Sequence, residues 1–373
     1  MKKILAILLS LTLAVTVLAG CGQKAAETDG EMGEQAGETG EVSGEDYKAV
    51  CLLNGNLGDK SFFDSANNGM KLLEEELGIE AKVIEMGFDN TKWKPALLEV
   101  SEQDWDIIIV GTWQMQEVLE EIAVEFPDKR YILFDSEVDN SDGEFDNIHS
   151  IMYKQNHGAY LAGIVAGELA AEGSNKAGIV GGMDIPVIND FMVGYMAGAK
   201  DVNPDVKILT NYIGDFDDTA KAKEMALSQY NQGAEVVFGV AAQAGLGVID
   251  AAKEKSSLTI GVDADQSATF TGIDDAKENA IVTSVLKNID VSILRAVEAH
   301  MKGDLEFGIT DTVGIPEGAV GIVKNQVYKS TIPLEIQDKV DEAEEKIASG
   351  EIEVPSAFDM TSDEIKELRD SMQ

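Results

Sequence analysis

The feature that most constrains the fold is a regular alternation of short β-rich runs with amphipathic helical segments. The run Asp106–Val110 is largely apolar, which is typical of a strand buried on both faces of a sheet. Four strand–helix repeats precede residue 135, and they predict a parallel sheet with helices on both faces. The pattern pauses over residues 135–147 and then resumes, which predicts a second α/β lobe.

The repeats predict the individual elements. Strands are expected at 47–53, 81–86, 106–110, 130–134, 176–180, 207–212, 235–239, 258–262 and 282–286. Helices are expected at 62–77, 94–103, 114–125, 156–171, 188–202, 218–232, 245–255, 289–301 and 334–349. Small residues along 156–171 indicate close helix packing. We expect an N-terminal lobe of residues 47–148 plus about 266–305, and a C-terminal lobe of residues 149–265 plus about 306–373, with the chain crossing between them several times.

The N-terminus carries an export signal. Lys2 and Lys3 precede the apolar run Ile4–Val17, and Leu18–Cys21 resembles the bacterial lipobox. Residues 1–20 are therefore predicted to be a lipoprotein signal peptide, with a lipid such as palmitate on Cys21 that anchors the protein to the outer face of the cell membrane. Residues 21–46 are rich in Gly and Glu and predict a flexible acidic linker.

Composition excludes several classes of function. The chain has 29 Lys+Arg against 68 Asp+Glu, a formal net charge of −39, so we expect no nucleic-acid partner and no basic membrane-binding patch. With Cys21 lipidated, Cys51 has no disulfide partner, and three histidines without a metal-binding motif predict no metal centre. No nucleophile lies in a recognisable catalytic motif, which favours a binding protein without a cofactor over an enzyme.

Loops that follow the strands are the places to look for a ligand site, because ligands of open parallel sheets bind at the carboxyl ends of strands. These loops combine small residues with polar or aromatic tips, which suits a ligand with both a flat face and hydroxyl groups. The candidate ligand-binding residues on these loops are Phe62, Phe63, Trp113, Met183, Phe191, Phe216, Ala241 and Asp263.

Local alternatives exist for three of these loops. Gly55–Ser61 superficially resembles a phosphate-binding loop, but Asp59 stands where that motif requires Lys. The spacing of Asp263, Asp265 and Ser267 resembles a calcium loop, although the position that requires Gly is Ala268. The plain structural interpretation is helix capping: Asp59 or Ser61 caps the helix that follows the first loop. In the same way, Asp217 or Asp218 caps the helix that begins there.

Taken together, the motifs resemble the BMP (basic membrane protein) family of bacterial lipoproteins, the PnrA-like nucleoside-binding proteins of ABC transporters. The resemblance runs from about Tyr47 to about Gly321. The stretches that carry it are Asp59–Phe62, Gly181–Ile188, Phe191, Gly214–Phe216, Gly261–Gln266 and Thr283–Lys287. It implies a type I periplasmic-binding-protein fold, in which two Rossmann-like lobes with parallel sheets surround a ligand cleft and are joined by hinge crossovers.

The resemblance also implies roles for single residues. Phe62 and Phe191 would sandwich a purine base, Asp263 and Lys287 would hold ribose hydroxyls, and Asp59 would contact the base. The partner implied is an ABC transporter permease. Phe63, Trp113 and the loop Ala241–Gly245 depart from the family pattern, so a sugar or signalling molecule is an alternative ligand for the same fold. A third hypothesis, from another class, is a surface adhesin or scaffold without a transport role.

Overall fold

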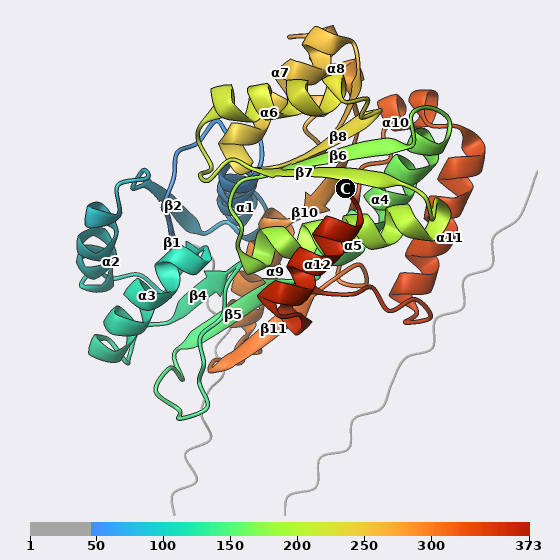
Figure 1. The fold of residues 1–373 in the computed structure, drawn as a ribbon. Coiled ribbons are helices and arrows are strands. Elements are labelled where there is room, and N and C mark those ends of the chain that lie inside the picture. The colour runs from blue at the N-terminus through green and yellow to red at the C-terminus, as the bar shows by residue number, and fades with distance from the viewer. Residues whose placement is uncertain (1–45) are drawn as a thin grey trace, which may run out of the picture. The chain divides into compact units, whose positions relative to one another are not determined.

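Two six-stranded sheets organise residues 46–373, the part of the chain that the computed structural model describes (Figure 1). The expected signal peptide, the lipidation site Cys21 and almost all of the expected linker lie outside the described residues. Among the helices that are described, none combines the length and hydropathy of a membrane span.

The first sheet is parallel throughout. Its order is β11 (Ile309–Val313), β5 (Ile148–Tyr153), β4 (Tyr131–Phe134), β3 (Ile107–Gly111), β1 (Lys48–Leu53) and β2 (Glu80–Glu85). One face is covered by α1 (Phe62–Leu77) and α9 (Ile289–Lys302), and the other by α2 (Trp93–Ser101) and α3 (Trp113–Glu125).

The second sheet repeats the plan with one antiparallel edge. Its order is β12 (Val320–Ile322), β10 (Ile281–Lys287), β9 (Leu258–Asp263), β8 (Val236–Val240), β6 (Lys176–Gly181) and β7 (Lys207–Tyr212), and only β12 is antiparallel. Its helices are α4 (Gln155–Ala171), α5 (Pro186–Val202) and α11 (Leu334–Ala348) on one face, and α6 (Thr219–Asn231) and α7 (Leu246–Lys255) on the other.

Short elements complete the two lobes. They are the helices α8 (Asp275–Ala280), α10 (Gln326–Thr331) and α12 (Ser362–Ser371), and the 3₁₀ turns at Asn90–Lys92, Ala242–Gly245, Ala268–Phe270 and Ala357–Asp359. The small residues of α4 bring α5 close, as predicted. A Cβ on Gly163 would lie 2.2 Å from the carbonyl oxygen of Tyr195, so a larger residue there would force the two helices apart.

The sheets differ from the expected lobe boundaries in three strands. β5 and β11 belong to the first sheet, whereas residues 149–153 and 309–313 were expected in the second lobe. β10 belongs to the second sheet, although residues 266–305 were expected in the first lobe. Within that range α9 belongs to the first lobe, where it packs against α1. β5, β11 and β12 were not predicted as strands, because β11 is a polar edge strand and β12 is very short.

Three crossovers join the lobes, in agreement with the prediction that the chain crosses between them several times. They lie between Tyr153 and Gln155, between Lys287 and Ile289, and between Val313 and Val320. β5, β10 and β11 therefore end directly at the hinge. Lys287, at the end of β10, contacts Asp135 of the first lobe and Phe191 of the second.

Candidate functional site

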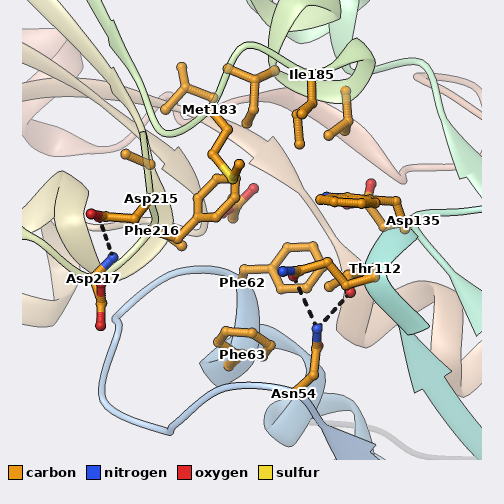
Figure 2. A pocket seen from close by; sticks show the side chains of 18 of the residues that line it. Asn54, Phe62, Phe63, Thr112, Asp135, Met183, Ile185, Asp215, Phe216 and Asp217 are labelled. Atoms are coloured by element: carbon orange, nitrogen blue, oxygen red, sulfur yellow. Dashed lines mark hydrogen bonds between the residues drawn. The ribbon is translucent and has the colours of Figure 1, made fainter. Parts of the chain in front are cut away.

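A cavity of about 240 Å³ lies between the lobes and is lined by the residues that follow the strands. Figure 2 shows Phe62, Phe63 and Asn54 of the first lobe facing Met183, Ile185 and Phe216 of the second. Loops after β1, β2, β3, β4, β6, β7 and β8 contribute to the lining, together with the ends of β9 and β10. The prediction that the strand ends meet across a cleft is thus confirmed by the geometry.

Nine of the ten predicted ligand-binding residues line this cavity. They are Phe62, Phe63, Trp113, Met183, Phe191, Phe216, Ala241, Asp263 and Lys287. Trp113 lies at the mouth with 46% of its surface exposed, while Phe191 is 2% exposed. The sequence pattern therefore located the cavity through residues of both lobes.

Asp59 is not among the lining residues, and its contacts explain why. Its fully buried carboxylate accepts hydrogen bonds from the backbone N–H groups of Ser61, Phe63 and Asp64 at 2.9–3.1 Å. These are donors that the first turn of α1 leaves without helical partners. Asp59 therefore holds the start of α1, which places Phe62 and Phe63 at the cavity wall.

Aromatic rings form both walls of the cavity. In the first lobe, Phe62 packs edge-on against Phe63 with centroids 5.3 Å apart. In the second lobe, Phe191 packs against Phe238 with centroids 6.2 Å apart. The ammonium of Lys287 lies 5.9 Å from the Phe62 centroid and 5.0 Å from the Phe191 centroid, so rings from opposite lobes face one shared cation.

Glycines at the strand ends make room for these rings rather than for a ligand, contrary to the expectation. A Cβ on Gly55 would lie 2.1 Å from the ring of Phe63, and one on Gly182 would lie 2.3 Å from the ring of Phe216. Contacts this short are impossible for a real side chain. Both positions therefore require glycine if the rings of Phe63 and Phe216 are to pack as they do.

Asp135, Asp263 and Lys287 form a charged cluster at the cavity. Lys287 Nζ donates to Asp135 Oδ1 at 2.5 Å, and the Ser61 hydroxyl donates to Asp263 Oδ2 at 2.5 Å. In each pair one partner comes from the first lobe and the other from the second. Both contacts therefore join the two lobes.

Burial shifts the proton affinities of this cluster. It raises the pKa of Asp263 to about 7, although Lys287 and the Ser61 hydroxyl favour the charged form and oppose the shift. It also raises the pKa of Asp135, again against the attraction of Lys287. Desolvation is the largest cause of the raised pKa of Asp263, and repulsion from two further carboxylates, Asp59 and Asp135, adds to it. Polar hydroxyl groups from a ligand would restore lost solvation.

A second polar group, the amide cluster of Asn54, Thr112 and Gln114, lines the cavity in the first lobe. The Asn54 amide nitrogen donates to Thr112 Oγ1 at 2.8 Å (Figure 2). It also donates to Gln114 Oε1 at 3.2 Å. Asn54 is 2% exposed, and all three side chains are uncharged. The cavity therefore has one charged and one neutral polar side.

Backbone strain is concentrated here. Four non-glycine residues of the lining, Thr112, Asp135, Ala242 and Asp263, have φ between 43° and 76°, in the left-handed region. Each follows or ends a strand. Such conformations cost free energy and persist where tertiary contacts hold them in place, which is common at ligand sites.

Sequence reasoning missed Asp135, Asn54, Thr112 and Gln114. Asp135 directly follows β4, and Asn54 directly follows β1, so the strand-end rule that found Asp263 applies to both. Asp135 was passed over because it opens the segment 135–147, which was treated as a break in the pattern. No local signal pairs it with Lys287, which lies 152 residues away.

The calcium alternative does not fit the geometry. Asp265 accepts hydrogen bonds from Ser267 and Asn325, and Asp263 points to Ser61 instead. Asp274 caps α8 and pairs with Lys253. Among the described residues no cluster of three His, Cys, Asp or Glu side chains is arranged to hold a metal. Asp218 caps α6, as the plain reading predicted.

The fold and the site define a class of protein: two-lobed binding proteins that hold a small molecule between α/β lobes joined by a hinge. Comparisons identify the family within that class. The Bmp family, described as "ABC transporter substrate-binding protein PnrA-like", matches residues 47–357 of this chain. The chain belongs to this Bmp family, so it is a substrate-binding protein of an ABC transporter, as the resemblance predicted, and not a member of an enzyme family.

Individual relatives agree with this assignment. A "CD4+ T-cell-stimulating antigen" of Listeria innocua is 30% identical over 369 residues, which cover 95% of this chain and 99% of the relative. The "ABC transporter nucleoside-binding protein BmpA" of Lactococcus lactis is 28% identical, with the same coverage. The solute-binding protein of an ABC transporter system from Aeropyrum pernix superposes with a TM-score of 0.75 at 26% identity, covering 87% of this chain and 98% of that one.

Proposed function

We propose that this protein captures a purine nucleoside between its lobes and delivers it to an ABC transporter permease. The observation that carries the proposal is the position of Lys287, whose ammonium faces Phe62 of one lobe and Phe191 of the other and bonds to Asp135. A flat base fits between aromatic walls, and ribose hydroxyls fit beside carboxylates and an ammonium. The Lactococcus relative, named as nucleoside-binding, supports the same ligand class.

The energetics are sufficient without a metal. Stacking on an aromatic side chain contributes about 1–3 kcal/mol per base. Hydrogen bonds to charged groups contribute about 1.5–3 kcal/mol each before ordering and desolvation are subtracted. A micromolar dissociation constant corresponds to about −8 kcal/mol, which two stacking rings and two or three charged hydrogen bonds reach before those costs are subtracted.

Calorimetric titration of the purified protein tests the proposal. We expect heat of binding with inosine, guanosine or adenosine, and none with free ribose, which has no base to stack. Phe62→Leu should weaken nucleoside binding by about fivefold or more, because one stacking ring is lost. Phe358→Leu is the matched control, since Phe358 is an exposed aromatic outside this cavity. Binding of free sugars alone would reject the nucleoside and favour a sugar-binding protein of the same fold.

A lipid on Cys21 would hold the protein beside the permease at the outer face of the membrane. The lipobox at Leu18–Cys21 and the acidic linker at 21–46 support this part of the proposal. Cell fractionation after expression of a Cys21→Ser variant is the test. The variant should leave the membrane fraction, whereas the unmodified chain should remain there and carry the mass of the lipid. Equal membrane association of both forms would contradict lipid anchoring.

A further inference from the structure

The C-terminal helix α12 carries an inference about how one wall of the cavity is held in place. We propose that α12 positions the loop of residues 182–185 through a bond between Arg369 and Asp184. Neither residue lines the cavity, so both act as positioning residues. The matched family region ends at residue 357, and α12 lies beyond it. The inference rests on the proposed function for its ligand and adds to it the residues that hold this wall.

The residues of this loop divide between the cavity and the outside. Met183 and Ile185 line the cavity (Figure 2), whereas Asp184, between them, does not. The Asp184 carboxylate is bonded on the outer side instead. Its Oδ1 accepts from Asn189 Nδ2 at 2.8 Å, and its Oδ2 accepts from Arg369 Nη1 at 3.2 Å. Because planar peptide bonds couple adjacent residues, a displacement of Asp184 moves the two side chains that line the cavity.

A closed network surrounds Asp184. The carbonyl oxygen of the Asn189 side chain accepts from the Tyr212 hydroxyl at 2.6 Å. The Tyr212 ring in turn lies 5.4 Å from the guanidinium carbon of Arg369. Side-chain exposure is 18% for Arg369 and 55% for Asp184, so their ion pair alone is weak, and the contacts of Tyr212 and Asn189 add to it. The network joins the loop to α5, to the end of β7 and to α12.

Other contacts fix α12 to the second lobe independently of Arg369. The helix lies beside α5 (Figure 1), and Ile365 and Met372 are buried in the same hydrophobic core as α5. The Met372 carbonyl oxygen also accepts from the backbone N–H of Ile208 in β7 at 2.7 Å. α12 is therefore a fixed support to which Arg369 ties the loop.

A loop that is already held in place favours binding. Ordering a mobile loop when the ligand binds costs free energy, and a positioned loop avoids that cost. Loss of the bond between Arg369 and Asp184 should therefore weaken nucleoside binding, mainly through faster release. Because the pair is partly exposed, we expect a loss of affinity of about twofold to fivefold.

Hydrogen exchange of the ligand-free protein tests the support directly. In Arg369→Met, the amides of Ile185 and Asn189, which bond within this segment, should exchange about threefold or more faster than in the unmodified protein. The amide of Ile208, which bonds to Met372, should exchange at an unchanged rate, because α12 stays in place.

Lys366→Met is the matched control. Lys366 lies on the same helix, but it pairs with Asp370 of that helix at 3.1 Å and not with the loop. This variant should change neither the exchange rates of the loop nor the affinity for nucleoside.

Titration with inosine then measures the effect on the ligand. Arg369→Met and Asp184→Asn should each lower the affinity about twofold to fivefold. The double variant should lose no more than the larger single loss, because both substitutions remove the same bond. Both single variants are measured, by exchange as well as by titration, so that a folding defect in one leaves a result from the other.

Three results would overturn the inference. The first is unchanged exchange at Ile185 and Asn189 in Arg369→Met. The second is faster exchange at Ile208 as well, which would show that Arg369 holds α12 rather than the loop. The third is a double variant in which the two losses of affinity add. If the unmodified protein binds no nucleoside, the proposed function is rejected, and the exchange rates alone decide this inference.

Discussion

At the scale of single residues, the main result is that ligand-binding candidates and structural carboxylates occur side by side. Asp59 lies in the loop after β1 and Asp263 ends β9, yet Asp59 is bonded to backbone amides and Asp263 lines the cavity. The burial and backbone conformation of Asp263 lower the free energy of unfolding of the protein. Its buried carboxylate has a raised pKa and a left-handed backbone, two features that a ligand site tolerates and a structural site rarely keeps.

Asp263→Asn should make the protein more stable at pH 8 and weaken nucleoside binding. With a pKa of about 7 in the folded state against an ordinary 3.8, folded Asp263 retains a proton that the unfolded chain has lost between about pH 4 and 7. The free energy of unfolding therefore falls as pH rises through this window, and the variant removes that loss. We expect Tm to rise by about 2 °C or more at pH 8 and to change little at pH 4.

Thermal unfolding at both pH values, followed by nucleoside titration, checks this prediction. Asp359→Asn serves as the control, because Asp359 is exposed and lies outside the cavity. A lower Tm for Asp263→Asn at pH 8 would show that its contacts with Ser61 and Lys287 outweigh the cost of its burial.

At the scale of elements, the loop between β1 and α1 connects the two lobes as well as supporting the cavity wall. The Lys60 ammonium donates to the Thr269 carbonyl oxygen at 3.3 Å and lies 5.1 Å from the Phe270 centroid. The Lys60 carbonyl oxygen accepts from Gln266 Nε2 at 3.2 Å. These contacts join the first lobe to the loop after β9, and they must break before the cavity opens.

Lys60→Met should speed release of the nucleoside about twofold to fivefold and leave the association rate nearly unchanged. The substitution removes a partly exposed cation contact that exists only in the closed arrangement, so it lowers the barrier to opening. Stopped-flow fluorescence measures both rates. Lys277→Met is the matched control, because Lys277 lies 5.1 Å from the same Phe270 ring but comes from the same lobe. Equal release rates in the two variants would contradict the role of the loop.

At the scale of the whole molecule, the three crossovers allow the lobes to move as two bodies. The contacts of the charged cluster and of Lys60 bridge the lobes, while each lobe has its own hydrophobic cores. A ligand that touches Phe62 and Phe191 together has more contacts in the closed arrangement. It therefore shifts the population towards closure.

Small-angle scattering with and without inosine tests closure. The radius of gyration should decrease when the nucleoside saturates the protein, and free ribose should not change it. At a free nucleoside concentration of about 100 times Kd, the same binding should also add about 2.7 kcal/mol to the free energy of unfolding. A radius of gyration that stays the same in the presence of bound nucleoside would show that the lobes do not close around it.

Local sequence determined the elements and most of the cavity lining. The sequence pattern predicted α1 at Phe62–Leu77 and β7 at Lys207–Tyr212 with the observed bounds. Burial of one helix face leaves a periodic pattern in neighbouring residues, and β7 has a run of strand-favouring residues although only Ile208 in it is fully buried. The strand-end rule then led to Asp263 and Phe191. Lys287, at the end of β10, was supplied by the family resemblance.

Only the tertiary structure decided which distant residues meet. Asp135 pairs with Lys287 across 152 positions, and Asn54 bonds to Thr112 across 58. The same holds for β5 and β11, whose place in the first sheet depends on pairing with each other and with β4 rather than on their own composition. Pairing of this kind is set by the packing of whole lobes around the crossovers, and the free energy that selects it is distributed over many contacts rather than written in any one segment.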